Sequence, residues 1–433
     1  MAEILPLRGW RYNEELGKNI DEHTSPLFDV VSTKQREKLY KNPYSSIHLS
    51  VPLGELPADK AGETLQMWKE TGIIKQDKLP SIYVYYQYFS LPGSVNELCR
   101  KGFICNVRVH DFDENVILRH ENTMPFSVND RLELLGKTEL NVSPTHGLYT
   151  DQVFELEEYM DEAMKLPVYE TEDYQGVRDV LAVIQDMNII KKFISKLSDE
   201  KIILADGHHR YQGSLEYMKK KKAENREHSG TEGYNFHAMY LTNTESDHLR
   251  IMPTHRLISG IEGFDESVVM KILSEYFIVK PVEDAFTLNE VITGKKWAFG
   301  LIFKNNAFKI KLKPEKINEI SWKFPEIIKH LDLTILHYFI LEKALKIPGN
   351  KQRDTKFVTY ERSFSDCYAK VLRGDAQMAV IVNEISVDIV KKVCASGFTL
   401  PQKSTYFYPK VISGFVYSSI NENEFKFPID FRL

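Results

Sequence analysis

Residues 202–224 constrain the fold of this chain most, because they combine a short apolar run, a glycine turn and a helical segment. The run IILA (202–205) predicts a short buried strand, and Asp206-Gly207 marks a turn after it. The next segment, HHRYQGSLEYMKKKKAE, predicts a helix that begins within two residues of the turn. Such a strand-to-helix passage is typical of α/β units, in which helices cover a sheet.

The same turn has the composition of an anion-binding site. The first turn of a helix offers unpaired N–H groups and the positive end of the helix dipole. Gly207 permits a positive φ angle and a close approach of the backbone to a ligand. His208, His209 and Arg210 add donor side chains: arginine suits bidentate phosphate contact, and a histidine can move a proton. We predict a phosphate site on this segment.

Asp206 has several interpretations from sequence. It could orient a histidine, hold Mg²⁺ or cap the helix. A purely structural interpretation, with Asp206 as the cap and the histidines on the surface, explains only one of the four residue types. A metal site built on the two histidines is disfavoured, because adjacent helical residues point about 100° apart.

A second group of candidates follows a predicted strand, in RHENTMPFSVNDRLELL (119–135). A carboxylate beside a histidine suits general-base work or the binding of Mg²⁺, and we predict Glu121 as the base that accepts a proton. The other candidates from this segment are expected to contact substrate: His120, Thr123 and Arg131. A structural ion-pair network explains the same residue types equally well.

Two shorter motifs supply the remaining candidates. The turn PTHRL offers Thr254, His255 and Arg256 for substrate binding, and KSTYFYPK offers Lys403 for phosphate. Each motif has a plain alternative: a satisfied turn in the first case and a solvated strand end in the second.

Composition excludes some function classes. The formal net charge of −5 gives no bulk attraction to nucleic acid or to an anionic membrane. The charged N-terminus is unlike a signal peptide, and no apolar run reaches the ~18 residues of a spanning helix, so we expect a cytoplasmic protein. The four cysteines are too sparse for a disulfide scaffold. No G-x-x-x-x-G-K-[ST] or G-x-G-x-x-G motif is present.

The pattern along the chain predicts a mixed α/β (α+β) fold in three parts. Residues 1–150 are β-rich, with aromatic strand runs at 81–93 and 101–123 that favour an antiparallel sheet. Residues 151–260 alternate strands and helices, and residues 261–433 form a mixed α/β region. Within this last region, the lysines of FKIKLK (308–313) are typical of an edge strand protected against aggregation.

Eight blocks of sequence, in order, resemble a large family catalogued as a domain of unknown function. They cover almost the whole chain: PLRGWRYN, SPLFDVV, GFICNVRVHDFDENVILRHENT, DRLELL, SPTHGLY, ADGHHRY, PTHRL and KSTYFYPKVISG. Two positions depart from the family pattern, because SPLFDVV stands where many relatives have Pro-Pro-Tyr-Asp and HENTM replaces His-Glu-Arg-Thr.

The resemblance implies a ParB/sulfiredoxin-like core at 151–260 and the activity of a pyrophosphate-dependent serine kinase. Such an enzyme makes O-phospho-L-serine and orthophosphate from free L-serine and pyrophosphate, with Mg²⁺. The resemblance implies that Asp206, Gly207, His208, His209 and Arg210 act at the transferred phosphate. We further predict that Asp206 and His209 take part in catalysis and that Asp206 holds Mg²⁺.

Two rival functions stay open at this stage. One is a serine kinase that uses ADP or ATP, and the other is a ParB-like protein that binds nucleotides or nucleic acid without catalysis. The acidic balance disfavours nucleic acid as a partner. The sequence predicts no oligomeric state.

Overall fold

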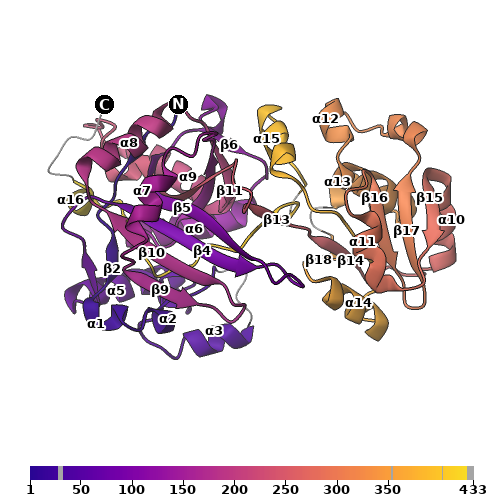
Figure 1. The fold of residues 1–433 in the computed structure, drawn as a ribbon, viewed down its shortest axis with the longest axis horizontal. Coiled ribbons are helices and arrows are strands. Elements are labelled where there is room, and N and C mark those ends of the chain that lie inside the picture. The colour runs from indigo at the N-terminus through magenta and orange to yellow at the C-terminus, as the bar shows by residue number, and fades with distance from the viewer. Residues whose placement is uncertain (28–32, 353–354, 402, 427–433) are drawn as a thin grey trace. The chain divides into compact units, whose positions relative to one another are not determined.

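The structure, a computed structural model, describes residues 1–27, 33–352, 355–401 and 403–426. The chain divides into two compact units (Figure 1). Unit 1 comprises Met1–Arg119, Thr123–Arg250 and the residues from Pro409 onward, and unit 2 comprises His120–Asn122 and Ile251–Tyr408. Each unit mixes helices with sheet, which confirms the predicted mixed α/β class.

Unit 1 is built on a nine-stranded sheet with the order β6-β11-β8-β12-β5-β4-β10-β9, in which β1 also pairs with β5. Its strands are β1 (Ile4–Leu5), β4 (Ile82–Ser90), β5 (Glu97–Arg108), β6 (Ile117–Arg119), β8 (Thr145–Tyr149), β9 (Tyr169–Glu172), β10 (Arg178–Ile184), β11 (Ile202–Asp206) and β12 (Phe236–Asn243). The pairs β4–β5, β5–β12 and β8–β11 are antiparallel, whereas β8–β12 and β6–β11 are parallel.

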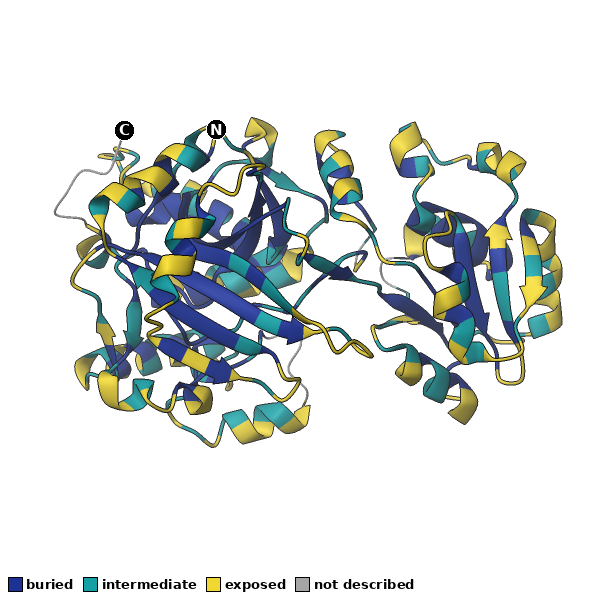
Figure 2. Ribbon diagram, in the orientation of Figure 1, coloured by how far each residue is buried: buried dark blue, intermediate teal, exposed yellow. Residues whose placement is uncertain are grey.

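Both faces of this sheet are covered, because both faces of its strands are apolar. Along β4, Val84 and Tyr86 belong to one core, which includes residues of α8 and α9, while Tyr83 and Tyr85 belong to the opposite core, which includes residues of α5. The principal helices of the unit are α5 (Pro57–Glu70), α6 (Pro125–Thr138), α7 (Glu157–Ala163), α8 (Met187–Ser198) and α9 (His208–Glu224). Figure 2 shows the strands buried along most of their length and the exposed residues mainly on helices and loops.

Shorter elements complete unit 1. They are α1 (Glu14–Gly17), α2 (Ile20–His23), α3 (Thr33–Leu39), α4 (Ile47–Ser50), α16 (Glu422–Phe425) and the two-stranded pairs of β2 (Trp10–Tyr12) with β3 (Ile74–Gln76) and of β7 (Leu140–Asn141) with β21 (Ser418–Ser419).

Unit 2 is built on a six-stranded sheet with the order β15-β17-β16-β19-β14-β18, in which the described strand pairs are antiparallel. Its strands are β14 (His255–Ile258), β15 (Phe277–Pro281), β16 (Ala298–Ile302), β17 (Ala307–Leu312), β18 (Val358–Glu361) and β19 (Met378–Ile381). Its helices are α10 (Glu266–Tyr276), α11 (Leu288–Ile292), α12 (Glu326–Lys329), α13 (Asp332–Ile335), which continues as a π-helix over Leu336–Ala344, α14 (Phe364–Arg373) and α15 (Val387–Ala395). A further pair joins β13 (Arg250–Met252) to β20 (Tyr406–Tyr408).

Two expectations differ from this architecture. The strand FKIKLK was expected at a sheet edge, but β17 lies between β15 and β16, so its lysines do not protect an edge. The expected boundary near residue 150 falls inside unit 1, because β8 and β12 from its two sides pair directly. The boundary expected near residue 260 lies close to Ile251, where the chain enters unit 2. Among the described helices, none is long and apolar enough to cross a membrane.

Candidate functional site

The turn between β11 and α9 has the predicted geometry. Strand β11 ends at Asp206 and α9 begins at His208, with Gly207 as the N-cap at φ 89°. A side chain at Gly207 would be crowded as well as strained, since its Cβ would lie 2.6 Å from Thr145 Cγ2 and 2.9 Å from Arg210 Nη2. Gly207 has no side chain with which to cap α9, so the N-cap residue leaves the N–H groups of the first helical turn to other acceptors.

Asp206 is an ion-pair centre and does not cap the helix. Its Oδ2 accepts a hydrogen bond from Arg210 Nη2 at 3.1 Å, and its Oδ1 accepts one from Lys410 Nζ. Burial raises the pKa of the Asp206 carboxyl, but the positive charges of Lys410 and Arg210 outweigh this effect, and the pKa lies well below its usual range. Asp206 is therefore ionised at neutral pH, held between two cations.

Arg210 also fixes a neighbouring loop. Its Nη1 donates hydrogen bonds to Ser143 Oγ at 2.9 Å and to the carbonyl of Pro144 at 2.8 Å, and the side chain is buried. Arg210 thus ties the SPTHGLY motif to the start of α9. The sequence suggested phosphate contact alone for this arginine, whereas the structure gives it a bridging role inside unit 1.

The two histidines of the motif have different environments. His208 is buried. His209 Nε2 accepts a hydrogen bond of 3.0 Å from the backbone N–H of Met124, so the proton of a neutral His209 lies on Nδ1. This contact places the start of α6 beside the start of α9, and with it the segment that contains Thr123.

Lys410 is positioned by a buried polar row that the sequence analysis did not identify. Gln87 Nε2 donates to the carbonyl of Lys410 at 3.0 Å and to Asp179 Oδ1 at 2.8 Å. Arg100 Nη2 donates to Gln87 Oε1 and to the carbonyl of Pro409. These side chains come from adjacent strands, because Gln87 pairs with Arg100 on one side and with Asp179 on the other. Polar residues inside the apolar runs SIYVYYQYFS and RDVLAVI are the signal that could have identified two of them.

Burial is the largest influence on the pKa values of Asp179, in this row, and of His146. It raises the pKa of Asp179 to about 7, against hydrogen bonds from Tyr85 and Gln87 that lower it. It lowers the pKa of His146 well below its usual value, and the nearby charge of Arg100 acts in the same direction. His146 is consequently neutral at pH 7, and its Nε2 lies 2.8 Å from Thr242 Oγ1.

A small cavity of about 30 Å³ lies beside Arg210, and Arg131 lines it too. This volume admits one or two water molecules. Arg131 donates from Nη1 to the carbonyl of Ser50 at 2.9 Å and pairs with Asp130. The structure therefore brings Arg131 and Arg210 to one cavity, although they are far apart in sequence.

Unit 2 contains the other predicted residues, in two groups. In the first, His120 Nε2 lies 2.7 Å from Thr405 Oγ1, and Glu121 Oε1 accepts a hydrogen bond of 2.7 Å from the backbone N–H of Lys403. The RHENT and KSTYFYPK motifs thus meet, despite a separation of 282 residues between Glu121 and Lys403.

The second group, from the PTHRL motif, is buried. Arg256 is fully buried, donates to the carbonyl of Thr254 and lies 5.5 Å from the ring centroid of Tyr360. Burial lowers the pKa of Arg256 to about 10 and that of His255 to about 4, so His255 is neutral at pH 7. His255 Nδ1 accepts a hydrogen bond from the N–H of Val382 at 3.3 Å.

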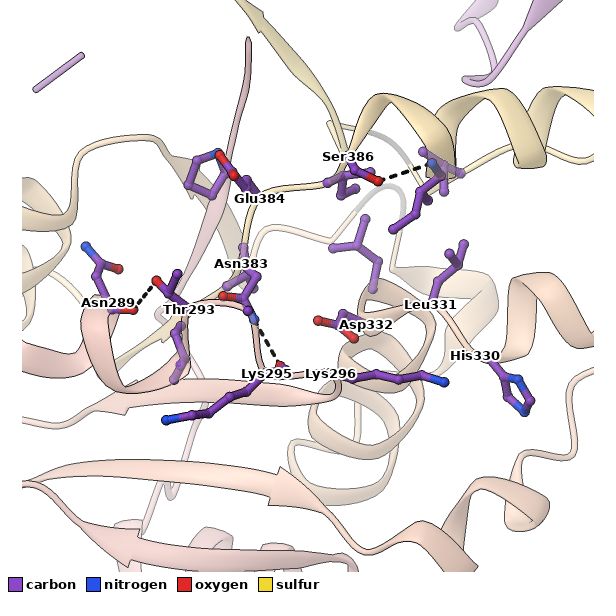
Figure 3. A pocket seen from close by; sticks show the side chains of 18 residues that line it. Asn289, Thr293, Lys295, Lys296, His330, Leu331, Asp332, Asn383, Glu384 and Ser386 are labelled. Atoms are coloured by element: carbon purple, nitrogen blue, oxygen red, sulfur yellow. Dashed lines mark hydrogen bonds between the residues drawn. The ribbon is translucent and has the colours of Figure 1, made fainter. Parts of the chain in front are cut away.

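A larger cavity of about 690 Å³ in unit 2 is lined by none of the predicted site residues (Figure 3). Residues 28–32, which include Asp29 of the SPLFDVV block, lie outside the described part of the chain.

Asp206 is the predicted ligand for Mg²⁺. Among the described residues, no three His, Cys, Asp or Glu side chains are grouped to hold a metal ion by themselves. Mg²⁺ commonly uses one or two carboxylates, with substrate phosphates and waters completing its shell. Asp206 fits that pattern, because each carboxylate oxygen has a second lone pair besides the one used by Lys410 or Arg210.

Comparison with known proteins places the chain in a family. Residues 4–334 match the model of the family DUF1015, described as a protein of unknown function, and the chain belongs to that family. The comparison with curated proteins found no match.

Among solved structures, the fold is similar to a free serine kinase in complex with AMP, with 12% identity, a TM-score of 0.38, and coverage of 75% of this chain and 93% of that chain. A conserved hypothetical protein from Pyrococcus furiosus has 13% identity and a TM-score of 0.34, covering 71% and 92% of the two chains. C-terminally truncated SbnI from Staphylococcus aureus has 10% identity and a TM-score of 0.35, covering 72% and 86%.

Proposed function

We propose that this protein is a phosphotransferase that makes O-phospho-L-serine and orthophosphate from free L-serine and pyrophosphate. The observation that carries the proposal is the start of α9, where the N-cap Gly207 is in the left-handed conformation and the Asp206 carboxylate is paired with Lys410 and Arg210. Backbone N–H groups, a helix dipole and two cations together favour a multiply charged phosphate.

The residues of this turn have distinct proposed roles. Lys410 and Arg210 keep Asp206 ionised, and the three groups give the site a net charge of +1 before the backbone is considered. Pyrophosphate receives hydrogen bonds from the helix N–H groups and from Lys410. Asp206 would hold Mg²⁺, and the ion would supply positive charge to neutralise the transferred group.

Proton transfer completes the proposed reaction. Glu121 accepts the proton of the serine hydroxyl as the serine oxygen bonds to phosphorus, and the bridging P–O bond breaks with its electrons on the departing orthophosphate. His209 is proposed to donate a proton to that orthophosphate. Protonation of His209 at Nε2 needs the lone pair that now accepts the hydrogen bond from the Met124 N–H. This role therefore predicts that the hydrogen bond between Met124 and His209 breaks during turnover.

A donor panel tests the proposal. The protein is incubated with L-serine, Mg²⁺ and, in turn, pyrophosphate, ADP and ATP, and phosphoserine is quantified by mass spectrometry. We expect phosphoserine with pyrophosphate and its loss in Lys410→Gln, while Lys165→Gln, at an exposed surface ion pair, retains activity. Phosphoserine from ADP or ATP but not from pyrophosphate would contradict the proposed donor.

The remaining rival, a non-catalytic protein that binds nucleic acid, has its own outcome. It predicts no phosphoserine with any donor, together with salt-dependent binding to duplex DNA.

A further inference from the structure

Four lysines gather on one face of the sheet in unit 2. Lys309 and Lys311 of β17 alternate with the core residues Ile310 and Leu312, so both side chains leave the same face of the strand. Lys280 of the edge strand β15 is paired directly with Lys309, and Lys309 faces Gly300 on its other side. On this face of the sheet an apolar core includes Ala298 and residues of α11, and the lysines lie outside that core.

Lys295 joins the group from the turn that follows α11. Figure 3 shows its side chain extending in the direction opposite to that of Lys296. Its Nζ donates to the carbonyl of Val291 at 2.8 Å. From this position the positive charge of Lys295 disfavours the protonated form of Lys309, as do the charges of Lys280 and Lys311.

The lysines face one another without a balancing carboxylate. Among the described residues, no Asp or Glu oxygen lies within 4.0 Å of any of the four ammonium groups. Burial and the charges of Lys295, Lys280 and Lys311 lower the pKa of Lys309 to about 8. The structure therefore keeps a set of like charges that oppose one another.

Protection of a sheet edge does not explain this arrangement. Lysines blunt an edge strand because they oppose pairing with another chain, but β17 is hydrogen-bonded on both sides. Like charges directly opposite on neighbouring strands destabilise a sheet. An anion between the ammonium groups would remove that repulsion.

We propose that Lys280, Lys295, Lys309 and Lys311 form a second anion-binding site, which takes a small anion with two or three phosphate groups. Directly opposed side chains lie about 5 Å apart at Cβ, and alternate residues of one strand lie about 7 Å apart. Those spacings match the separation of charges in a di- or triphosphate, whereas a nucleic acid would use a longer row of cations. The proposal is independent of the function proposed above, because none of the predicted site residues belongs to this cluster.

Footprinting of amines in the full-length protein tests this site. The protein is acetylated at pH 8 with and without inorganic tripolyphosphate, and labelling of each lysine is followed by mass spectrometry. An amine with a pKa near 8 reacts faster than an ordinary lysine, and a bound anion slows it about fivefold for the first unit by which the pKa rises and about tenfold for the next. We expect slower labelling of Lys309, with no change at Lys304 in the neighbouring β16–β17 turn.

Two variants separate the sites. Protection of Lys309 should persist in Lys410→Gln, whose change affects the start of α9, and should weaken in Lys280→Gln. Equal labelling of Lys309 with and without tripolyphosphate would overturn the proposal, as would equal protection by sodium chloride at matched ionic strength. Stronger protection by an oligonucleotide, at the same concentration of phosphate groups, would assign the surface to nucleic acid instead.

Discussion

The ion pair between Asp206 and Lys410 makes a quantitative prediction about stability. Removing one member of a buried pair costs about 3–5 kcal/mol, because the other charge stays buried without compensation. The side chain of Asp206 is 16% exposed and that of Lys410 is 10% exposed, so water screens the pair in part. We therefore expect Asp206→Asn to lower the free energy of unfolding by about 2–3 kcal/mol. Lys410→Met should cost less, about 1–2 kcal/mol, since Asp206 retains Arg210.

The double variant measures the interaction itself. Asp206→Asn alone leaves two unpaired cations, whereas the double variant Asp206→Asn with Lys410→Met leaves one. The loss of unfolding free energy in the double variant should therefore be smaller than the sum of the two single losses by about 1–2 kcal/mol. Urea unfolding of unit 1 gives these values when tryptophan fluorescence reports that unit alone. A background with Trp297→Phe and Trp322→Phe provides this, because the remaining tryptophans, Trp10 and Trp68, are in unit 1.

The contribution of Asp206 to stability depends on pH with a definite sign. The folded-state pKa of Asp206 is lowered, so its contribution to stability is present above the unfolded value of about 3.9 and is lost as pH falls below it. Glu162→Gln, in an exposed pair with Lys165, should change stability by less than about 0.5 kcal/mol. The reasoning is refuted if Asp206→Asn is as stable as wild type, or if the two costs add fully.

Three further predictions concern the same site. Gly207→Ala should destabilise unit 1 by about 2–4 kcal/mol, and Gly176→Ala, with φ 76° but open space around it, by only about 1; equal costs in urea unfolding would show that crowding at Gly207 is unimportant. Asp179 has a raised pKa of about 7, so its contribution to stability is present below about pH 4 and is lost as pH rises through 7, by up to about 4 kcal/mol; Asp179→Asn should flatten this slope in unfolding curves from pH 5 to 8, and an unchanged slope would contradict the assignment. Arg210→Lys keeps the charge but loses the paired contacts to Ser143 and Pro144, so we expect a loss of about 1–3 kcal/mol and faster exchange of the Ser143 and Thr145 amides; wild-type exchange there would show that Arg210 does not hold this segment.

Local signals in the sequence predicted local structure well. The strand, turn and helix around Gly207 were all predicted, since each depends on residues within a few positions. The apolar segment 331–345 gives a similar local signal, because a run of this length favours a helix over a strand, and it is helical as α13 and its π-helical continuation. The acidic segment 151–166 is helical only over Glu157–Ala163, because its first residues form turns.

Long-range pairing was beyond the same reasoning. The position of β17 inside a sheet depends on β15 and β16 on either side, and an alternating lysine strand has the same pattern at an edge. Asp206 meets Lys410 over 204 positions of sequence, so no spacing rule could choose it over Lys403. The buried row of Arg100, Gln87 and Asp179 depends on strand register, which single strands do not specify.

The most direct test of the central claim is a ³¹P NMR measurement of the complete reaction. The wild-type protein, with L-serine, Mg²⁺ and pyrophosphate, should form one phosphoserine for each orthophosphate released, and Lys410→Gln should lower the rate at least about a hundredfold, as loss of a phosphate-binding cation does. Release of two orthophosphates without phosphoserine, or an unchanged rate in Lys410→Gln, would contradict phosphate transfer at the start of α9.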